Sequence, residues 1–160
     1  MKEKQLLSTF RIYQFEELEK EQQELLLAAK EQVYRSYSPY SHFQVGAAAK
    51  LANGMIIRGS NQENAAYPSG LCAERTTLFA AGATYPEEKV THLAIACFTQ
   101  GHYTANPGSP CGSCRQVMVE TEHRYSGNMQ VLLYGEKCVY VFDSAKDLMP
   151  LSFLTEDLLG

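Results

Sequence analysis

A short apolar run, HLAIACF at residues 92–98, lies between two helix-forming segments, and this order leaves few folds open. A partly β-branched apolar run of this length is typical of a strand that is buried on both faces. The helical segment before it covers about residues 73–81, with Gly82 as its expected C-terminal stop, and Pro110 opens the one after it. Such strand–helix–strand connections join parallel strands by right-handed crossovers. The sequence therefore predicts a layered α/β fold.

The remaining segments extend this pattern on both sides. Residues 16–37 are rich in helix formers and place most of their apolar side chains on one stripe. Asn53-Gly54, a strong hairpin signal, separates two strands expected at about 43–51 and 55–60. Two more strands follow at 129–134 and 138–143, and we expect them to be antiparallel neighbours. The chain ends with a short helical segment that is broken at Pro150.

The element order α-β-β-α-β-α-β-β predicts a three-layer α/β/α sandwich around a mixed five-stranded sheet. We assign residues 15–160 to this single domain and expect it to be a catalytic domain. Residues 1–14 form an N-terminal extension without an assignment, although TFRIYQF has some character of an edge strand.

Composition narrows the possible partners. The chain has 160 residues, of which 45% are hydrophobic and 20% charged, which is ordinary for a soluble globular domain. Its net charge of −4 opposes nucleic-acid binding, which needs a basic stripe. We find neither a membrane-spanning run nor the apolar stretch of a signal peptide. Five cysteines without a secretory signal favour a reducing, cytoplasmic location and thiolates that bind metal.

Residues 110–114, PCGSC, place two cysteines where their thiolates can bind one ion. The chain has no second Cys-x-x-C pair and no His-x₃₋₅-His, so the other ligands must come from elsewhere. Cys72 stands at the start of the preceding helix, where the helix N-terminus stabilises a thiolate. Cys72, Cys111 and Cys114 would leave one tetrahedral position open, which is the mark of a catalytic Zn²⁺.

Glu74 follows Cys72 by two residues, and on a helix such residues point about 200° apart. Both can face one ion if Cys72 lies at the helix cap, and Glu74 then suits a general base that is not a ligand. Simpler interpretations exist, namely a redox-active or buried Cys-x-x-C and a glutamate that only complements the helix dipole. A structural four-cysteine site would need Cys97 or Cys138, which are more typical of small buried residues in strands.

The segments Cys72-Ala73-Glu74 and Pro110–Cys114 match the zinc-deaminase signature H-x-E…P-C-x-x-C, with Cys in place of His. Together with FQVGAAA, NQENAAYPSGLCAER and PCGSCRQV in this order, they closely resemble the small homotetrameric cytidine deaminases, from about Pro39 onwards. The resemblance implies hydrolytic deamination of free cytidine and deoxycytidine to uridine and deoxyuridine plus ammonia, in pyrimidine salvage. It implies one Zn²⁺ per chain, held by the three cysteines, with Glu74 as the proton shuttle.

The resemblance also implies roles for residues around the metal. Asn61 and Glu63 would hydrogen-bond the ribose 3′-hydroxyl, Phe43 would pack against the nucleoside, and the backbone around Ala73 would read the pyrimidine edge. Arg75 would hydrogen-bond the ligand sulfurs and so offset their charge, because a centre of three thiolates and one Zn²⁺ has a net charge of −1. Without the resemblance, Asn61 and Glu63 suit a turn, Phe43 suits a core, and Arg75 suits a solvated surface.

The resemblance further implies a homotetramer with shared active sites. Phe153 would cross to a neighbouring subunit and stack on its base, and the loop from Ala65 to Tyr67 would contribute to an adjacent site. A tail phenylalanine is otherwise more often a clamp on its own core.

Three other functions remain open to comparison. A deaminase of a nucleoside analogue such as blasticidin S shares the same motifs. A polynucleotide deaminase shares the zinc chemistry, but the acidic charge and the groups expected to clasp a 3′-hydroxyl oppose it. A non-catalytic zinc-binding module would unfold when the metal is chelated, whereas a catalytic site would lose activity first.

Overall fold

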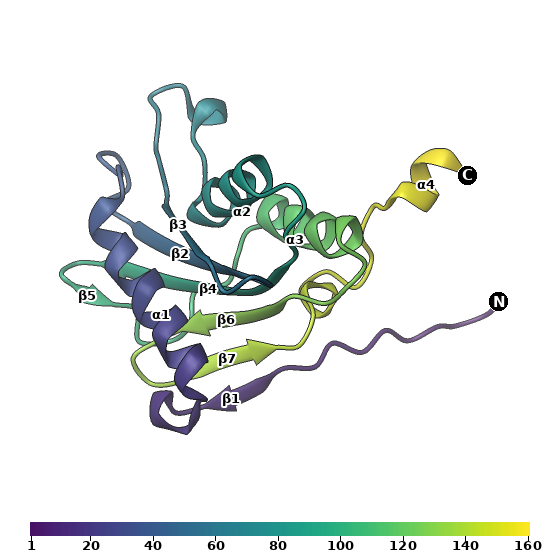
Figure 1. Ribbon diagram of the computed structural model, residues 1–160, viewed down its shortest axis with the longest axis horizontal. Coiled ribbons are helices and arrows are strands. Elements are labelled where there is room, and N and C mark those ends of the chain that lie inside the picture. Colours follow the sequence, from purple (N-terminus) through teal and green to yellow (C-terminus); the bar gives the residue numbers. More distant parts are fainter.

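The computed structural model describes residues 1–160 and contains one mixed seven-stranded sheet with helices on both faces (Figure 1). The strand order is β1-β7-β6-β4-β2-β3, and β5 pairs with β4 off this path. The strands are β1 (Arg11–Tyr13), β2 (Gln44–Leu51), β3 (Ile56–Ser60), β4 (Val90–Thr99), β5 (His102–Tyr103), β6 (Gln130–Tyr134) and β7 (Val139–Phe142). The helices are α1 (Lys20–Gln32), α2 (Ala73–Thr84), α3 (Gly112–Arg124) and α4 (Thr155–Leu159).

The two faces of the sheet carry separate hydrophobic cores, because successive strand residues point to opposite sides. On one face, Leu25, Leu26 and Ala29 of α1 pack over Ala94 and Leu132 of β4 and β6. On the other face, α2 and α3 cover a larger core, which includes Ala47, Leu93, Ile95, Met118 and Leu133. This arrangement confirms the expected three-layer α/β/α sandwich.

The expected number of five strands is wrong, because the sheet has seven. β1 lies within TFRIYQF at the edge of the sheet, which confirms the edge-strand character of that segment, and it pairs antiparallel with β7, from Arg11 opposite Val141 to Tyr13 opposite Val139. β5 turns back on the end of β4 through Gln100 and Gly101, whose φ angles are 53° and 84°. A strand of two residues, such as β5, is too short to show the alternation by which a strand is recognised in sequence.

Helix ends also differ from expectation. The segment 16–37 contains a 3₁₀ turn at Phe15–Glu17, then α1, then a second 3₁₀ turn at Val33–Arg35. Gly82 is not a stop, because α2 continues to Thr84. A Cβ at Gly82 would lie 2.9 Å from Nη1 of Arg124, the end of a flexible side chain on α3. Pro150 separates a 3₁₀ turn at Ala145–Leu148 from α4.

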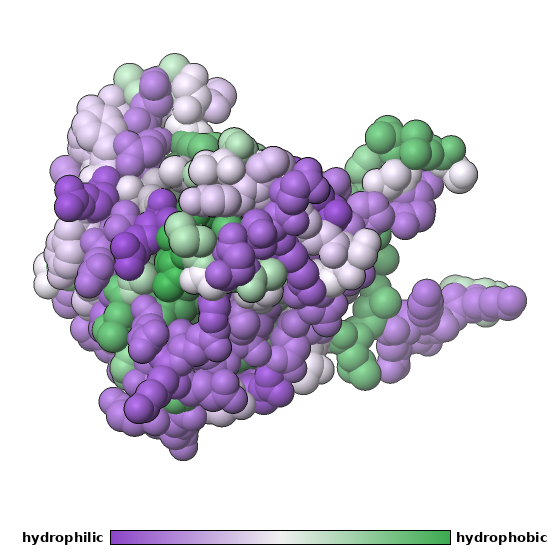
Figure 2. Space-filling model, in the orientation of Figure 1, coloured by the Kyte–Doolittle hydropathy of each residue, from purple (hydrophilic) through white to green (hydrophobic).

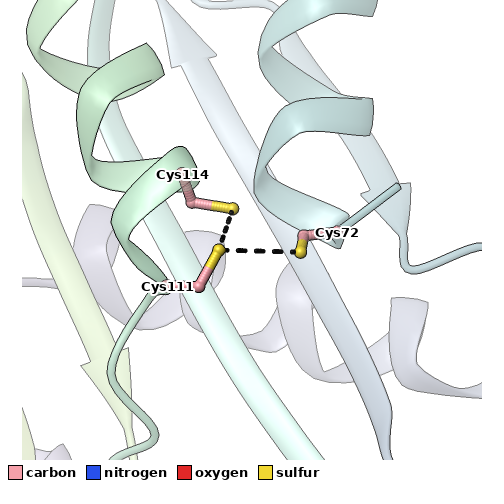
Figure 3. Close-up of side chains that lie close together, drawn as sticks. All are labelled: Cys72, Cys111 and Cys114. Atoms are coloured by element: carbon pink, nitrogen blue, oxygen red, sulfur yellow. Dashed lines mark hydrogen bonds between the residues drawn. The ribbon is translucent and has the colours of Figure 1, made fainter. Parts of the chain in front are cut away.

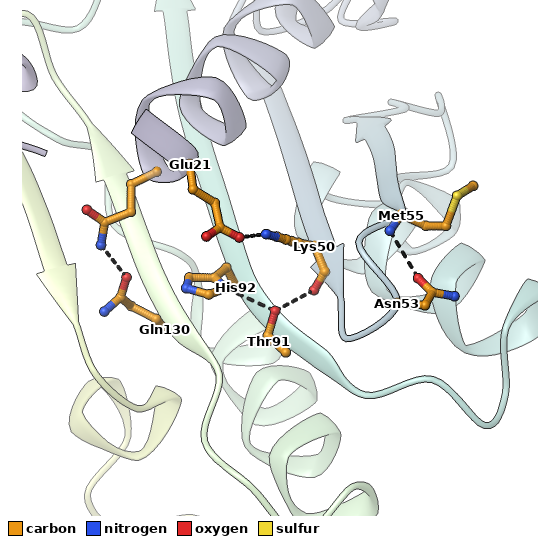
Figure 4. Close-up of polar contacts among 8 residues, drawn as sticks. Glu21, Lys50, Asn53, Met55, Thr91, His92 and Gln130 are labelled. Carbon is orange, nitrogen blue, oxygen red and sulfur yellow. Dashed lines mark hydrogen bonds and ion pairs between the residues drawn. The ribbon is translucent and has the colours of Figure 1, made fainter. Parts of the chain in front are cut away.

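Polar contacts fix α1 to the sheet at the amino end of β4 (Figure 4). Glu21 of α1 forms an ion pair with Lys50 of β2, and the Thr91 hydroxyl donates to the Lys50 carbonyl at 3.1 Å. In the neighbouring β2–β3 hairpin, the side chain of Asn53 accepts from the Met55 N–H at 3.0 Å. This end of the sheet is therefore structural, which leaves the opposite end available for a functional site.

Topology places the two helix N-termini at that opposite end. β3 and β4 are both antiparallel to β2, so they run parallel to each other, and β4 also runs parallel to β6. α2 begins after the carboxyl end of β3, and α3 begins after the carboxyl end of β4. The carboxyl ends of parallel strands meet at one edge of a sheet, where ligands commonly bind in α/β folds. None of the helices is both long and apolar enough to cross a membrane.

Candidate active site

Three cysteines converge between the N-termini of α2 and α3 (Figure 3). Cys72 is the N-cap of α2 and Cys111 the N-cap of α3, both with extended backbone, and Cys114 is buried in the first turn of α3. The Sγ atoms of Cys72 and Cys111 are 3.9 Å apart, and those of Cys111 and Cys114 are 3.5 Å apart. All three sulfurs lie within 4.8 Å of one another.

This spacing fits a single metal ion. Zn²⁺ binds thiolates at about 2.3 Å in tetrahedral geometry, which places two ligand sulfurs about 3.8 Å apart. The two measured separations lie on either side of this value. Two helix N-termini also direct positive partial charge at the sulfurs, which favours the thiolate form that metal binding requires. Three ligands leave a tetrahedral ion one open position.

Cys72 and Cys114 differ in how strongly they hold their protons. The pKa of Cys72 is lowered to about 5, first by its hydrogen bond with the Cys114 thiol and also by Arg75. Nη2 of Arg75 donates to the Cys72 sulfur at 3.6 Å. The same bond with Cys72 raises the pKa of Cys114 above its usual range. Of Cys72 and Cys114, Cys72 is therefore the thiol that ionises first.

Glu74 is the second residue of α2, and its side chain is only 5% exposed. It lines the same cleft as Cys72 because Cys72 lies at the cap rather than within the helix. Burial disfavours the charged carboxylate and raises the pKa of Glu74. A buried carboxyl group with a raised pKa beside a possible metal site is a suitable proton carrier.

The cleft in which these groups lie has a volume of about 370 Å³. It brings together half of the candidate residues from the sequence, together with several that sequence reasoning missed. Its lining consists of Ser41, Phe43, Val45, Asn61, Glu63, Cys72, Glu74, Ile95, Cys97, Gly108, Ser109 and Cys111. A second pocket of about 460 Å³ shares Ser41, Asn61, Glu63 and Cys72 with it and is also lined by Tyr67 and Arg75.

Asn61 and Glu63 are both held by hydrogen bonds before any ligand binds. The Asn61 side-chain oxygen accepts from Ser36 Oγ at 2.6 Å and from the Val45 N–H at 2.8 Å, and its Nδ2 donates to the Phe43 carbonyl at 2.9 Å. Glu63 Oε2 accepts from the N–H groups of Tyr40 and Ser41, at 2.9 and 3.3 Å. Glu63 Oε1 accepts from the Ser41 hydroxyl.

The pKa of Glu63 is lowered, first by the Ser41 hydroxyl bond and then by the Tyr40 N–H. Glu63 is therefore an anion at neutral pH. The Asn61 amide donates only one of its two N–H groups within the chain, so the other is free for a ligand.

Other candidates do not reach the cleft of their own chain. Phe153 is 59% exposed in the tail before α4, where its carbonyl accepts from Gln116 of α3 at 2.7 Å. Ala65 is exposed, and Tyr67 is 79% exposed at the rim of the second pocket. Ala73 is fully buried, so its methyl group belongs to the core.

Sequence reasoning missed Cys97 as a lining residue. It is buried in β4, as expected for a small residue of a strand, but it also lines the cleft. Burial raises the pKa of its thiol to about 12, so the thiol is neutral. A Cβ on Gly108 would lie 2.6 Å from its sulfur, which shows how closely the loop before Pro110 covers this thiol. Its place at the carboxyl end of a strand was the available signal.

Comparisons with known proteins agree with this site. Residues 19–126 match the family model described as the cytidine and deoxycytidylate deaminase zinc-binding region. A cytidine deaminase of Halalkalibacterium halodurans is 41% identical over 127 residues, which are 77% of this chain and 86% of that protein. A probable cytidine deaminase of Dictyostelium discoideum is 31% identical over 91% of this chain and 89% of its own length.

Solved structures agree as well. The crystal structure of a cytidine deaminase from Burkholderia pseudomallei superposes with a TM-score of 0.70 at 39% identity, over 81% of this chain and 97% of that one. A family match across more than half of the chain, with relatives at this identity, is sufficient for assignment. The chain therefore belongs to the cytidine and deoxycytidylate deaminase family of zinc-dependent hydrolases.

Proposed function

We propose that the protein catalyses the hydrolytic deamination of free cytidine and deoxycytidine, which gives uridine or deoxyuridine and ammonia, and that it serves pyrimidine salvage. The observation that carries the proposal is the meeting of a three-cysteine cluster and the buried Glu74 in one cleft. The relatives named above as cytidine deaminases support the choice of cytidine. The five free cysteines are consistent with a reducing cytoplasm.

Cys72, Cys111 and Cys114 would hold one Zn²⁺ per chain. When bound, zinc supplies a Lewis acid that makes water a nucleophile at neutral pH. Glu74 takes up the proton that the attacking water gives up and delivers a proton to N3 of the pyrimidine. It then carries a proton to the departing amine, so a single carboxylate serves both transfers.

Arg75 would offset the charge of the thiolates. Three thiolates and one Zn²⁺ have a net charge of −1, which weakens the metal as a Lewis acid. The donation from Nη2 of Arg75 to the Cys72 sulfur draws negative charge away from that sulfur. Nε of Arg75 is buried and has no partner within the chain, so the guanidinium has unused donor capacity.

The free capacities of Asn61 and Glu63 fit a sugar hydroxyl. Asn61 has one N–H left to donate, and the Glu63 carboxylate can only accept. A hydroxyl group accepts from the first and donates to the second, so we assign the 3′-hydroxyl of the ribose to this pair. A phosphate cannot donate and would be repelled by the Glu63 anion. This argument favours free nucleosides over polynucleotides.

Phe43 would pack against the nucleoside at the mouth of the cleft, where it is 37% exposed. The backbone around Ala73 would read the edge of the pyrimidine. We also propose a homotetramer in which Phe153, Ala65 and Tyr67 complete the sites of neighbouring chains. The large exposure of Phe153 and Tyr67 in a single chain supports this assembly. Exposed apolar residues also gather on the C-terminal segment around α4, which extends away from the body (Figures 1 and 2).

An ultraviolet assay with a panel of substrates tests the proposed function. Purified protein should deaminate cytidine and deoxycytidine and release one ammonia per turnover, but should act poorly on cytosine, dCMP and blasticidin S. Cytosine lacks the sugar that Asn61 and Glu63 bind. Preferential turnover of blasticidin S would instead assign the protein to the nucleoside-analogue deaminases, and no turnover of any compound by zinc-loaded protein would favour a binding module.

A further inference from the structure

Ser41 lies in a turn that joins two of the proposed substrate-binding residues. The turn covers residues 38–43 before β2, and His42 adopts a left-handed backbone with φ of 54°. The His42 N–H closes the turn on the Ser38 carbonyl at 3.1 Å. This geometry directs the backbone N–H groups of Tyr40 and Ser41 at the Glu63 carboxylate.

The Ser41 hydroxyl makes two contacts of opposite direction. It donates to Oε1 of Glu63, and it accepts from the Phe43 N–H at 3.0 Å. Ser41 also lines both the cleft and the adjoining pocket. One hydroxyl group therefore links the turn, the carboxylate and the first residue of the FQV segment within the proposed sugar site.

The hydrogen-bond count of Glu63 shows why this contact matters. An ionised carboxylate has about four acceptor positions, and three are filled by Tyr40 and Ser41. Both backbone contacts go to Oε2, so the hydroxyl is the contact that holds Oε1. Without it, the carboxylate would be fixed at one oxygen only and would be free to turn the other away from the cleft.

We propose that Ser41 is a positioning residue that orients the Glu63 carboxylate toward the sugar hydroxyl of the substrate. This inference rests on the proposed function, in which Glu63 binds the 3′-hydroxyl. Ser41 acts through Glu63 and is not itself required for proton transfer. Its loss should weaken substrate binding and leave the chemical step intact.

The test compares cytidine with its 3′-deoxy analogue, which lacks the hydroxyl in question. For Ser41→Ala we expect KM for cytidine to rise roughly 10- to 150-fold, the range for a lost hydrogen bond to a charged group, with kcat little changed. Binding of the 3′-deoxy analogue, measured as a substrate or as an inhibitor of cytidine turnover, should stay within about twofold of the wild type. Ser41→Thr keeps the hydroxyl and should restore most of the affinity. Zinc content should equal that of the wild type in both variants.

A double-mutant cycle separates positioning from a general structural effect. Ser41→Ala should add little to the KM increase caused by Glu63→Gln, because both changes disable the same contact. Additive effects, or equal effects on both nucleosides, would overturn the proposal. If Ser41→Ala does not fold, Ser41→Cys offers the same comparison with a weaker donor.

The wild type distinguishes the two ways in which the idea can fail. If wild-type protein binds cytidine and the 3′-deoxy analogue equally, Glu63 does not bind that hydroxyl, and this part of the proposed function fails together with the role of Ser41. If the wild type discriminates between the two nucleosides and Ser41→Ala changes the binding of neither, only the role of Ser41 is wrong.

Discussion

Glu74 and Cys72 are separated by a single residue, yet both face one cleft, because Cys72 lies at the N-cap and Glu74 lies in the first turn. This arrangement predicts that proton transfer and metal binding can be separated by mutation. Glu74→Gln is nearly isosteric and should keep zinc, but turnover of cytidine should fall at least 10²–10⁴-fold because the proton carrier is lost. Metal analysis and the ultraviolet assay on the same sample measure both. The neighbouring control Glu120→Gln, on α3, should behave as the wild type. A Glu74→Gln variant close to wild-type rate would remove Glu74 from the mechanism.

Arg75 offers a second prediction at the residue scale. Arg75→Gln removes the donor to the Cys72 sulfur and leaves the charge of the thiolates uncompensated. Hydrogen bonds to charged groups contribute about 1.5–3 kcal/mol, so kcat/KM should fall roughly 10- to 150-fold while zinc is retained. Arg58→Gln, at an exposed position of β3, is the matched control. An unchanged kcat/KM in Arg75→Gln would mean that Arg75 is only a charge on the helix surface.

Among the elements, β1 extends the sheet beyond the five expected strands, and its packing can be tested without changing the cleft. Phe10, just before β1, has its ring centroid 4.9 Å from that of Tyr140 and 5.1 Å from that of Phe142. Aromatic pairs contribute about 0.5–1.5 kcal/mol each. Phe10→Ala should therefore lower the free energy of unfolding by about 1–3 kcal/mol, measured in urea at fixed protein concentration, with kcat/KM unchanged. Leu7→Ala is the control, since Leu7 is 88% exposed. Equal effects of the two substitutions would show that the contacts of Phe10 do not contribute to stability.

The elements also show what sequence could and could not predict. The five longer strands and the three main helices were predictable because each carries an apolar run, a hairpin signal or a helix boundary within its own residues. β1 was indicated only by the weak edge-strand character of TFRIYQF, and β5 was not predictable, since its pairing depends on the neighbouring strand β4. Gly82 did not end the helix as expected, because the hydrogen bonds of α2 continue past it to Thr84. The cysteine cluster was accessible through the spacing of Cys111 and Cys114 and the position of Cys72 at a helix start, whereas the contact of Ser41 with Glu63 carries no such signal and needs the folded turn.

At the scale of the whole molecule, the exposed Phe153 leads to a prediction about shared sites. Phe153→Ala should raise KM for cytidine or lower kcat/KM roughly 5- to 150-fold. This change corresponds to the loss of about 1–3 kcal/mol of base stacking. When inactive Glu74→Gln chains are mixed with Phe153→Ala chains and allowed to reassemble, activity should exceed the sum of the two separate samples. The gain is expected because a site with an intact Glu74 then receives an intact Phe153 from its neighbour. For comparison, the mixing experiment is repeated with Leu158→Ala chains in place of Phe153→Ala chains, because Leu158 is also exposed in the tail. Full activity of a dilute monomer in sedimentation would contradict shared sites.

The central claim is that the cysteine cluster and Glu74 together form a zinc-dependent deaminase site, and a zinc titration tests it most directly. Protein freed of metal by a chelator should be largely folded but inactive toward cytidine. Added Zn²⁺ should restore turnover in proportion to the metal bound, up to one ion per chain. Cys111→Ala should neither bind the metal tightly nor recover, whereas Cys138→Ala, which lies outside the cluster, should do both. Undiminished cytidine turnover by the metal-free protein, or by Cys111→Ala, would contradict the account.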